Sequence, residues 1–343
     1  MNITTSLNAR HLQTPVVSTF GPQTSADEVM RGLTLQGRRA VVTGGHAGLG
    51  LETVRALLKA GAEVIVPARR PEVAWQALEA LQGLGGIEGL DRVTVAELDL
   101  RDRDSIDAFA AEVVRDPRAL DILINNAGIM ATPLARDAHG HEMQWSVNHL
   151  GPFRLTARLW PALVRARGAR VIMLSSGAHR FAAVDLEDPN FLHRPYDKWQ
   201  AYGQSKTASA LFALALDHRG HEFGVSAFSV HPGSIQTGLS QHLTQQDLMQ
   251  IGALDANGQL TPAFEKLSKT IPQGAATTLW CATSAQLDER GGVYCEDCNV
   301  SPLLAPSDPS LHGVMPWACD LATAEDLWRL SQRQNELVFD CRP

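Results

Sequence analysis

The sequence predicts a single-domain α/β protein, with helices on both faces of a doubly wound parallel sheet of about seven strands. Three observations predict this class. From Gly37 onwards, short apolar runs alternate with longer amphipathic stretches, as in sheets whose parallel strands are joined by helices. A glycine-rich turn at residues 44–50 directly follows the first apolar run. Polar motifs stand at the ends of later runs, which is where such sheets bind ligands.

Each expected strand is a short apolar run, and each expected helix is an amphipathic stretch between two such runs. The first helix ends at Gly61, and the second opens with Pro71. The expected strands are Arg39–Thr43, Glu63–Ala68, Val93–Leu100, Asp121–Asn125, Ala169–Ser175 and Val225–His231. The expected helices are Leu49–Ala60, Pro71–Leu81, Asp102–Val114, Glu142–Arg165 and Trp199–Arg219.

Two terminal regions flank this alternation. Residues 1–35 are polar and form an N-terminal arm, which we expect to pack on the catalytic domain of residues 36–300; a disordered tail is the alternative. Residues 301–343 form a C-terminal tail, and its terminal helix is expected at Ala324–Gln332 with Thr323 as the cap.

Two connections are unusually long, and both leave the carboxyl ends of strands. Long connections in compact domains are usually functional lids or disorder. We expect Gly177–Lys198 to form a wall of an apolar pocket and residues 236–270 to form a substrate lid over it; contacts between subunits are the alternative. The apolar side chains expected around this pocket are Phe181, Phe191, Trp199, Leu239, Leu243, Leu248 and Met249, with Met130 and Trp145 below.

Composition limits the classes of function. The 343 residues carry a formal net charge of −7 and no run of basic residues, which argues against a nucleic-acid partner. No apolar run is long enough for a membrane anchor or a signal peptide. Five cysteines favour reduced thiols and a cytoplasmic location. Cys295 and Cys298 have the spacing of half a zinc site, but two thiols do not complete a tetrahedral shell, so no metal is expected.

The glycine-rich turn predicts a Rossmann-type dinucleotide site. Gly44, Gly48 and Gly50 lie between a strand and a helix, and they permit a tight turn with close approach of the backbone to a pyrophosphate. A glycine-rich turn without a ligand is the alternative.

The end of the second strand favours NADP(H) over NAD(H). An NAD site places an acid there for the ribose 2′-hydroxyl, whereas this chain has Arg69 and Arg70 and no acid before Glu72. A guanidinium suits the 2′-phosphate. Arg69 is the first candidate, and His46 and Arg70 are possible helpers for which a solvated surface role is an equal alternative.

Two later strand ends supply further candidates for cofactor contact. Asp99 is placed to bond the adenine, although capping the next helix is an alternative role. Asn125-Asn126-Ala127-Gly128 closes the fourth strand, where small residues admit the adenine ribose and the Asn side chains can tie strands together. The cofactor contacts expected from these motifs are Gly44, His46, Gly48, Leu49, Gly50, Arg69, Asp99, Leu100, Asn126, Ala127, Gly128, Tyr202 and Lys206.

Tyr202 and Lys206 carry the predicted chemistry. They are four residues apart on one expected helix, so their side chains share a face. An ammonium at ~4 Å stabilises a phenolate by about 4 kcal/mol at an effective dielectric near 20, or roughly three pKa units before desolvation. That shift brings the phenol towards neutrality, where a general acid/base works best. Ser176 is placed to hydrogen-bond the substrate oxygen.

These motifs resemble those of the short-chain dehydrogenase/reductase family over roughly residues 36–300. The resemblance implies that Pro232-Gly233 belongs to the cofactor site and that Thr237 contacts the nicotinamide carboxamide or the pyrophosphate. It also implies a kink in a long helix at the catalytic asparagine, whose backbone carbonyl holds a proton-relaying water. The catalytic residues that it implies are Asn148, Ser176, Tyr202 and Lys206.

Tyr202 follows Ser176 by 26 residues, whereas many members of the family have about a dozen. With the motifs Asn-His-Leu-Gly and His-Pro-Gly, this interval resembles the retinol-dehydrogenase-like and WW-domain-oxidoreductase-like branch, which acts on lipophilic carbonyls. We therefore expect an NADP(H)-dependent oxidoreductase that interconverts an apolar carbonyl and alcohol, with homo-oligomer formation left open. The alternative is a non-catalytic NADP-binding sensor or scaffold, and the intact Ser, Tyr and Lys argue against it.

Overall fold

A computed structural model of the protein describes residues 12–83, 86, 88–235, 243–305, 307–308, 310 and 312–342. Its centre is an eight-stranded sheet in the order β3-β2-β1-β4-β5-β6-β7-β8. The first seven strands pair in parallel, and β8 pairs with β7 in the antiparallel direction. The expected doubly wound parallel sheet is confirmed, and the two strands without an expected range are β7 (Tyr294–Glu296) and β8 (Asn299–Val300).

The bounds of most elements agree with the expected ones to within a few residues. The strands are β1 Arg39–Val42, β2 Glu63–Ala68, β3 Val93–Glu97, β4 Ile122–Asn125, β5 Ala169–Leu174, β6 Val225–His231, β7 Tyr294–Glu296 and β8 Asn299–Val300. The α-helices are α2 Ala26–Met30, α3 Gly48–Lys59, α4 Pro71–Gly83, α5 Arg103–Arg115, α6 Met143–Trp145, α7 Gly151–Arg165, α8 Lys198–Gly220, α9 Gln245–Gln250, α10 Pro262–Leu267, α11 Ile271–Thr283 and α12 Leu321–Asn335.

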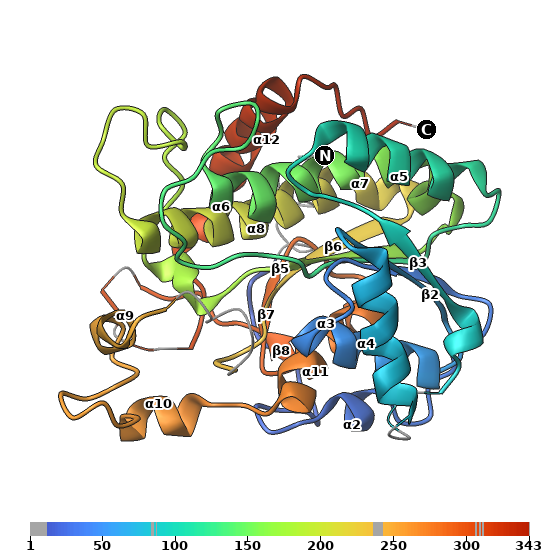
Figure 1. Cartoon of the computed structure of the whole chain (residues 1–343), viewed down its shortest axis with the longest axis horizontal. Helices are drawn as coiled ribbons and strands as arrows, with labels where there is room; N and C mark the ends of the chain where they lie inside the picture. The colour runs from blue at the N-terminus through green and yellow to red at the C-terminus, as the bar shows by residue number, and fades with distance from the viewer. Residues whose placement is uncertain are drawn as a thin grey trace, which may run out of the picture.

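The helices form a layer on each face of the sheet (Figure 1). One face is covered by α5, α7 and α8 with α12 outside them, and the other by α3 and α11 with α2 beside them. The strand order reverses between β1 and β4, which both pair with their neighbours in parallel. In an open α/β sheet a ligand crevice forms at such a reversal, outside the carboxyl ends of the strands. None of the described helices is long and apolar enough to cross a membrane.

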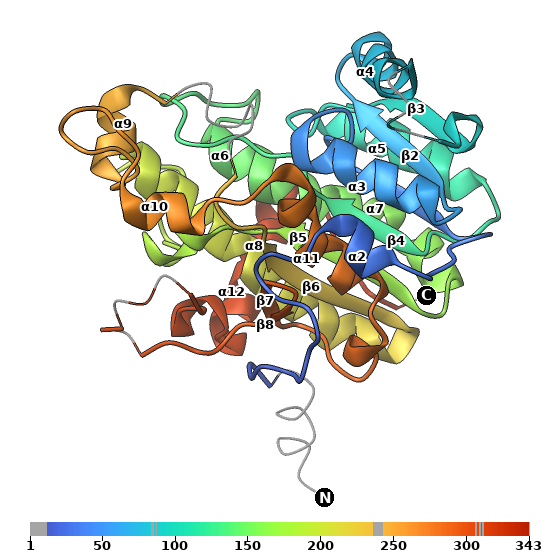
Figure 2. The same ribbon diagram turned by 90° about the horizontal axis from the view of Figure 1, so that it is seen from below.

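The described part of the N-terminal arm lies along the β7–β8 edge and then packs on α3 and α11 (Figure 2). Gln13 donates to the carbonyls of Tyr294 and Ser301 at 2.7 Å. Val16 exchanges hydrogen bonds with the Asn299 side chain. These contacts hold the described part of the arm against the β7–β8 end of the sheet.

The C-terminal helix α12 docks on α8 and is longer than expected. Its cap is Asp320 and not Thr323: the carboxylate accepts from the Thr323 backbone N–H at 2.7 Å, so Thr323 is the third residue of the helix. Trp328 is buried, stacks on Phe339 at 4.8 Å between ring centroids and lies 4.3 Å from the Arg219 guanidinium. A large aromatic side chain in such a site contributes strongly to stability.

We expect Trp328→Ala to lower the free energy of unfolding by about 3–5 kcal/mol, because it leaves a large cavity between α8 and α12. Val338→Ala is the matched control on the same segment, since its side chain is 85% exposed and should change stability by less than about 0.5 kcal/mol. Urea unfolding of both variants measures the difference. Equal, small effects would show that α12 is not part of the cooperative fold.

Candidate active site

The glycine-rich turn joins β1 to α3 and leaves the start of that helix free of side-chain caps. Gly44 and Gly48 have φ angles of +65° and +51°, a region that other residues rarely adopt. A β-carbon at Gly50 would stand 2.2 Å from the Gly44 carbonyl oxygen, so only glycine fits there. The N-cap residue Ala47 offers no side-chain hydrogen bond. The first N–H groups of α3 are thus placed to bind an anion such as a pyrophosphate.

The end of β4 is tied to this turn by side chains. The Thr43 hydroxyl accepts from the backbone N–H groups of Asn126 and Ala127 at 3.0 Å each. The Asn126 side chain donates to the Thr43 carbonyl at 2.9 Å. Asn126 therefore supports the cofactor turn with its side chain, which is the strand-tying role that the sequence left open.

The basic residues expected to read a 2′-phosphate gather beside this turn. Arg69 and Arg70 are exposed just beyond β2. The pKa of His46 is lowered by burial and by the charges of both arginines, so the three side chains share one neighbourhood. The Nδ1 atom of His46 is buried and has no hydrogen-bond partner among the described residues. An unpaired nitrogen at this position is available to a polar ligand.

Asp99 does not cap the helix that follows β3. That cap is Asp102, whose carboxylate accepts from the backbone N–H groups of Asp104 and Ser105. The Asp99 carboxylate instead pairs with Arg101 at 2.6 Å, which helps to keep the Asp99 pKa below its usual value against the effect of burial. Leu100, also expected at the cofactor, is buried, and its carbonyl packs directly against Gly151.

Asn148 lies in a π-helical turn, Ser146–Leu150, between α6 and α7. Its side chain accepts from the Ile129 N–H and donates to the Ile129 carbonyl, both at 2.9 Å, and also donates to the Ser205 hydroxyl at 2.9 Å. The long helix expected at Glu142–Arg165 is thus interrupted by a π-helical turn at Asn148, where the family resemblance implies a kink. The Asn148 side chain fixes the segment after β4 against α8, and the Asn148 backbone carbonyl accepts a long hydrogen bond from the Ser209 hydroxyl at 3.5 Å.

Tyr202 and Lys206 are both buried on α8. The Lys206 ammonium donates to the Leu174 carbonyl at 2.8 Å, where β5 ends. A β-carbon at Gly128 would lie 3.4 Å from the Lys206 Nζ and 3.0 Å from the Asn148 Oδ1, so these three predicted residues meet at one point.

The two serines after β5 have different partners, which bears on the choice between them. The Ser175 hydroxyl donates to the Lys206 carbonyl at 2.7 Å and is buried. The Ser176 hydroxyl accepts from the Ala178 N–H at 3.2 Å and hydrogen-bonds the Tyr202 side chain. Ser176 is thus the serine that faces the phenol, while Ser175 joins β5 to α8.

The expected lowering of the Tyr202 pKa is wrong for the protein without its cofactor. Burial raises the pKa of Tyr202 to about 12, and the hydrogen bond from Ser176 offsets this only in part. Burial also lowers the pKa of Lys206 to about 8. The Lys206 Nζ lies 5.7 Å from the Tyr202 ring centroid and is directed to the Leu174 carbonyl. Loss of hydration outweighs the attraction between the two groups, and the sequence alone does not reveal burial.

The Pro-Gly motif after β6 is joined to the serine segment by His231. The Nδ1 atom of His231 accepts from the Gly177 N–H at 3.1 Å and from the Gly233 N–H at 3.3 Å. Gly233 has a φ angle of +99°. Pro232 precedes it at the carboxyl end of the sheet. Thr237, the last expected cofactor contact, lies outside the described residues.

Comparison with known proteins gives consistent matches over most of the chain. A family model described as short chain dehydrogenase matches residues 38–248. A probable oxidoreductase from Streptomyces lividans is 43% identical over 297 residues, which cover 86% of this chain and 97% of that protein. The chain belongs to the short-chain dehydrogenase/reductase family. Its membership makes the protein an oxidoreductase of a family that interconverts carbonyls and alcohols with NAD(P).

Two further relatives of this short-chain dehydrogenase/reductase cover nearly the whole chain. Retinol dehydrogenase 14 of Homo sapiens is 32% identical over 312 residues, which cover 87% of this chain and 86% of the relative. A crystal structure of an uncharacterized protein from Mycobacterium paratuberculosis has a TM-score of 0.69 and 31% sequence identity, and the match covers 92% of this chain and 99% of that one. The eight-stranded, single-domain α/β architecture is therefore shared with a solved structure.

The short-chain dehydrogenase/reductase has an apolar cluster over Tyr202, to which both long connections contribute. The cluster consists of Met130, Ala131, Ala178, Trp199, Tyr202, Leu243 and Ile251. Lys198 forms a 2.5 Å ion pair with Asp247, which joins the start of α8 to α9. Figures 1 and 2 both show α9 and α10 on the side of the molecule opposite α4.

Of the apolar residues expected in this pocket, Trp145 and Phe191 are not part of the cluster, and Met249 and Phe181 are exposed to solvent. Trp145 is fully buried in the core cluster that also contains α12, and its indole donates to the Gln334 side chain at 2.8 Å. Phe191 is buried against Arg194 and Tyr196. Met249 is 38% exposed. Phe181 is 49% exposed and meets the edge of Trp199. Leu239 lies outside the described residues.

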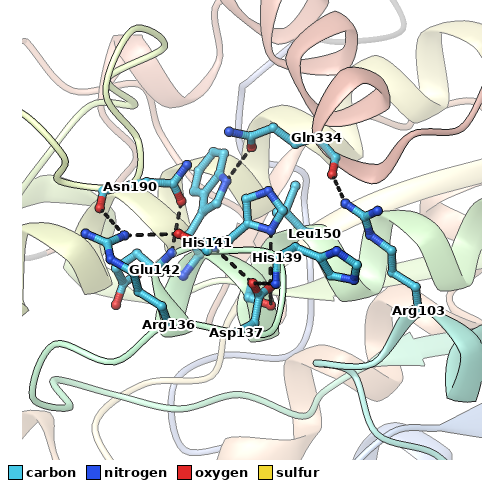
Figure 3. A network of polar contacts seen from close by, with 12 residues as sticks. Arg103, Arg136, Asp137, His139, His141, Glu142, Leu150, Asn190 and Gln334 are labelled. Carbon is cyan, nitrogen blue, oxygen red and sulfur yellow. Dashed lines mark hydrogen bonds and ion pairs between the residues drawn. The ribbon is translucent and has the colours of Figure 1, made fainter.

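Sequence reasoning missed a buried polar network that holds the helix of Asn148 in place (Figure 3). Glu142 is fully buried and accepts from the Trp145 N–H at 2.8 Å, while its own N–H donates to the Asn190 side chain at 2.9 Å. Arg136 donates to the Asn190 carbonyl, so the first long connection is fixed at two points. Burial raises the pKa of Glu142, and its hydrogen bonds oppose this. Ordinary polar residues far apart in the chain give no sequence signal for such a network.

No group of three or more His, Cys, Asp or Glu side chains in the described part of the chain is arranged to hold a metal ion. Cys295 and Cys298 are free and buried beside β7 and β8.

We expect Lys206→Met to stabilise the protein by about 2 kcal/mol at pH 7. The pKa of Lys206 is about 8 in the folded protein and 10.5 in a model peptide, so between these values the unfolded chain binds more protons and stability rises with pH. Burying the ammonium therefore lowers the stability of the wild type by about 3 kcal/mol below pH 8. The substitution removes this cost, but it also leaves the Leu174 carbonyl without a hydrogen-bond partner, which costs about 1 kcal/mol.

The advantage of Lys206→Met should shrink as pH rises from 8 to 10.5, because the wild-type lysine is then neutral in both states. Urea unfolding at pH 7 and pH 10 measures it. Lys59→Met, at a side chain that is 61% exposed, is the matched control. A stability difference that is the same at both pH values would contradict the assigned burial cost.

Proposed function

We propose that the protein is an NADP(H)-dependent oxidoreductase that interconverts a carbonyl and an alcohol on a small apolar substrate. The observation that carries the proposal is the buried Tyr202 hydroxyl, which hydrogen-bonds Ser176 beneath an apolar cluster and stands one helical turn from Lys206. A binding protein without turnover has no need for this combination of groups.

The residues fit the cofactor that the family uses. The tight turn before α3 requires glycine at position 50, where a β-carbon would clash with the Gly44 carbonyl, and the buried His46 Nδ1 lacks a partner among the described residues. The Lys206 Nζ lies beside Gly128 at the end of β4, where it would hold the nicotinamide ribose. The bound cofactor supplies or accepts the hydride.

Tyr202 moves the proton in this proposal. Because its pKa is about 12, the phenol is protonated at neutral pH and can donate to the oxygen of a carbonyl as charge develops there. The Ser176 hydroxyl stabilises the same oxygen. With a pKa of about 8, Lys206 exchanges protons near neutral pH and is suited to restoring the proton of the phenol.

The case for NADP(H) rests on charge at the end of β2. Arg69 and Arg70 are exposed there and close enough to His46 to lower its pKa. The nearby carboxylate of Asp99 is paired with Arg101, so it competes little for the ribose hydroxyls. Two exposed guanidinium groups directly after β2, where an NAD site has an acid, favour a 2′-phosphate.

The case for an apolar substrate rests on the cluster over Tyr202 and on the relatives. The side chains of Met130, Trp199, Leu243 and Ile251 belong to that cluster, and none carries a charge. A relative named retinol dehydrogenase 14, at 32% identity, has an apolar substrate in its name. We infer a substrate of the same broad chemical class, a lipophilic aldehyde, ketone or alcohol.

We expect Tyr202→Phe to lower kcat by about 10²–10⁴-fold with NADPH affinity nearly unchanged, because only the transferable proton is lost. A screen of aldehydes, ketones and alcohols, followed at the nicotinamide absorbance, supplies the substrate. Tyr196→Phe is the matched control: it also removes a phenol oxygen, but a partly buried one that bonds Glu142 and the Thr132 carbonyl. If the Tyr202 variant kept more than about a tenth of the wild-type rate, the acid/base assignment would be wrong. NADPH binding with no turnover of any carbonyl would favour the sensor alternative.

We expect Arg69→Ala to weaken NADPH binding by roughly 10- to 150-fold and NADH binding by less than about threefold, because a charge-assisted contact to phosphate contributes about 1.5–3 kcal/mol. The dissociation constants of both cofactors, measured by fluorescence titration, test this. Arg70→Ala removes the same charge one residue later. If both variants lose the same NADPH affinity, the two arginines attract the phosphate only through their general positive charge. If Arg69→Ala weakens NADPH and NADH binding equally, Arg69 does not contact the 2′-phosphate.

A further inference from the structure

One peptide group beside the proposed catalytic serine is held at both ends by histidine rings. The carbonyl of Ser176 accepts from the Nδ1 of His179 at 2.8 Å and from the His179 backbone N–H at 3.1 Å. The N–H of the same peptide group, that of Gly177, donates to the Nδ1 of His231 at 3.1 Å. The plane of this peptide is thus fixed from two directions.

The His179 ring is arranged to act as a donor on this side. It is fully buried, and its Nε2 accepts from the Met315 N–H at 3.2 Å, so the proton is on Nδ1 and points to Ser176. Tyr294 packs on the ring at 4.8 Å between centroids, and its hydroxyl lies 3.1 Å from Nδ1. Burial lowers the pKa of His179 to about 4, which keeps the ring neutral.

The His231 ring is arranged to act as an acceptor. Its Nδ1 takes hydrogen bonds from Gly177 and also from Gly233 at 3.3 Å, so this nitrogen carries no proton. A β-carbon at Gly177 would lie 3.2 Å from the His231 Nε2, which shows how closely the ring covers this peptide. Burial, with nearby positive charges, lowers the pKa of His231 well below its usual value.

Ser176 needs such support because it stands beyond the hydrogen-bond ladder of the sheet. The last ladder bond between β5 and β6 runs from the Ser175 N–H to the Val230 carbonyl at 2.8 Å. Ser176 is extended, with φ −164° and ψ 157°, and is only partly buried. An error of about 1 Å in the place of a catalytic hydroxyl can slow a reaction by about a hundredfold.

We propose that His179 and His231 are positioning residues that clamp the Ser176–Gly177 peptide and so aim the Ser176 hydroxyl at the substrate oxygen. The proposal rests on the proposed function, in which Ser176 stabilises that oxygen. His231 extends the clamp to Gly233, which couples the serine to the predicted cofactor segment after β6.

Paired substitutions at His179 separate the two ring nitrogens. His179→Asn places an amide N–H near the position of Nδ1 and keeps the donor to Ser176, but loses the acceptor for Met315. His179→Gln places its amide near Nε2 and keeps only the contact with Met315. Both variants lose one hydrogen bond and the aromatic ring, so thermal unfolding should show similar losses of stability. We expect kcat to stay within about threefold of wild type in His179→Asn and to fall at least about tenfold in His179→Gln, with KM and NADPH affinity little changed.

A double-mutant cycle with Ser176→Ala shows whether His179 acts through the serine. In the Ser176→Ala background, His179→Gln should cause no further loss of kcat, because the hydroxyl that it positions is gone. Losses that multiply, or equal kcat values for His179→Asn and His179→Gln, would overturn the clamp. A Ser176→Ala variant with the full wild-type rate would instead overturn the role of Ser176 in the proposed function, and the purpose of the clamp with it.

The same comparison at His231 gives an independent reading. His231→Asn can present its amide oxygen near the position of Nδ1 and accept from Gly177, whereas His231→Gln cannot. A rate retained by Asn and lost by Gln supports the clamp, and equal rates refute it. If both His179 variants fail to fold, this second pair decides the matter.

Discussion

Lys206 is 5% exposed, and its ammonium donates to the Leu174 carbonyl at 2.8 Å, where β5 ends. Directly after the strand, the Ser175 hydroxyl donates a hydrogen bond to the Lys206 backbone carbonyl at 2.7 Å. These two contacts join α8 to β5 at the edge of the sheet. Tyr202 lies one helical turn before this junction and Ser176 one residue beyond it, so the junction sets the relative position of every group proposed to act on the substrate.

A buried ammonium is tolerated because the helix that carries it is buried nearly all round. Helix α8 packs on β5 and β6 with one side, on residues Gly177–Arg180 with another, and beneath α12 with a third. A β-carbon at Gly203 would stand 2.7 Å from the Ala178 carbonyl, so small residues are required where the backbones approach. Helix α12 thus contributes to the site without touching it, since it covers the outer side of α8.

The sequence predicted the parts of the site whose partners lie within one element or one turn. The spacing of Tyr202 and Lys206 places them on one helix face, and the glycines before α3 require a turn. It failed where partners are remote. Glu142 meets Asn190, and Trp145 meets Gln334, across long stretches of chain, and nothing in an Asn or Gln residue reveals such a partner. The expected direction of the Tyr202 pKa shift was wrong for a related reason. Residue spacing shows which side chains are neighbours, but it does not show how far a side chain is removed from water.

A parallel sheet places its functional groups just beyond the last ladder bonds, because that is where strands from distant parts of the chain end together. The same position removes the main source of rigidity, since the ladder no longer fixes the backbone there. Side chains must then fix the backbone instead. In this chain they are Asn126 at the end of β4, Asn148 in the π-helical turn, and His179 and His231 around Ser176. Each of these side chains bonds a backbone group. Polar residues that seem catalytic by type can therefore serve the chemistry by fixing the main chain that carries it.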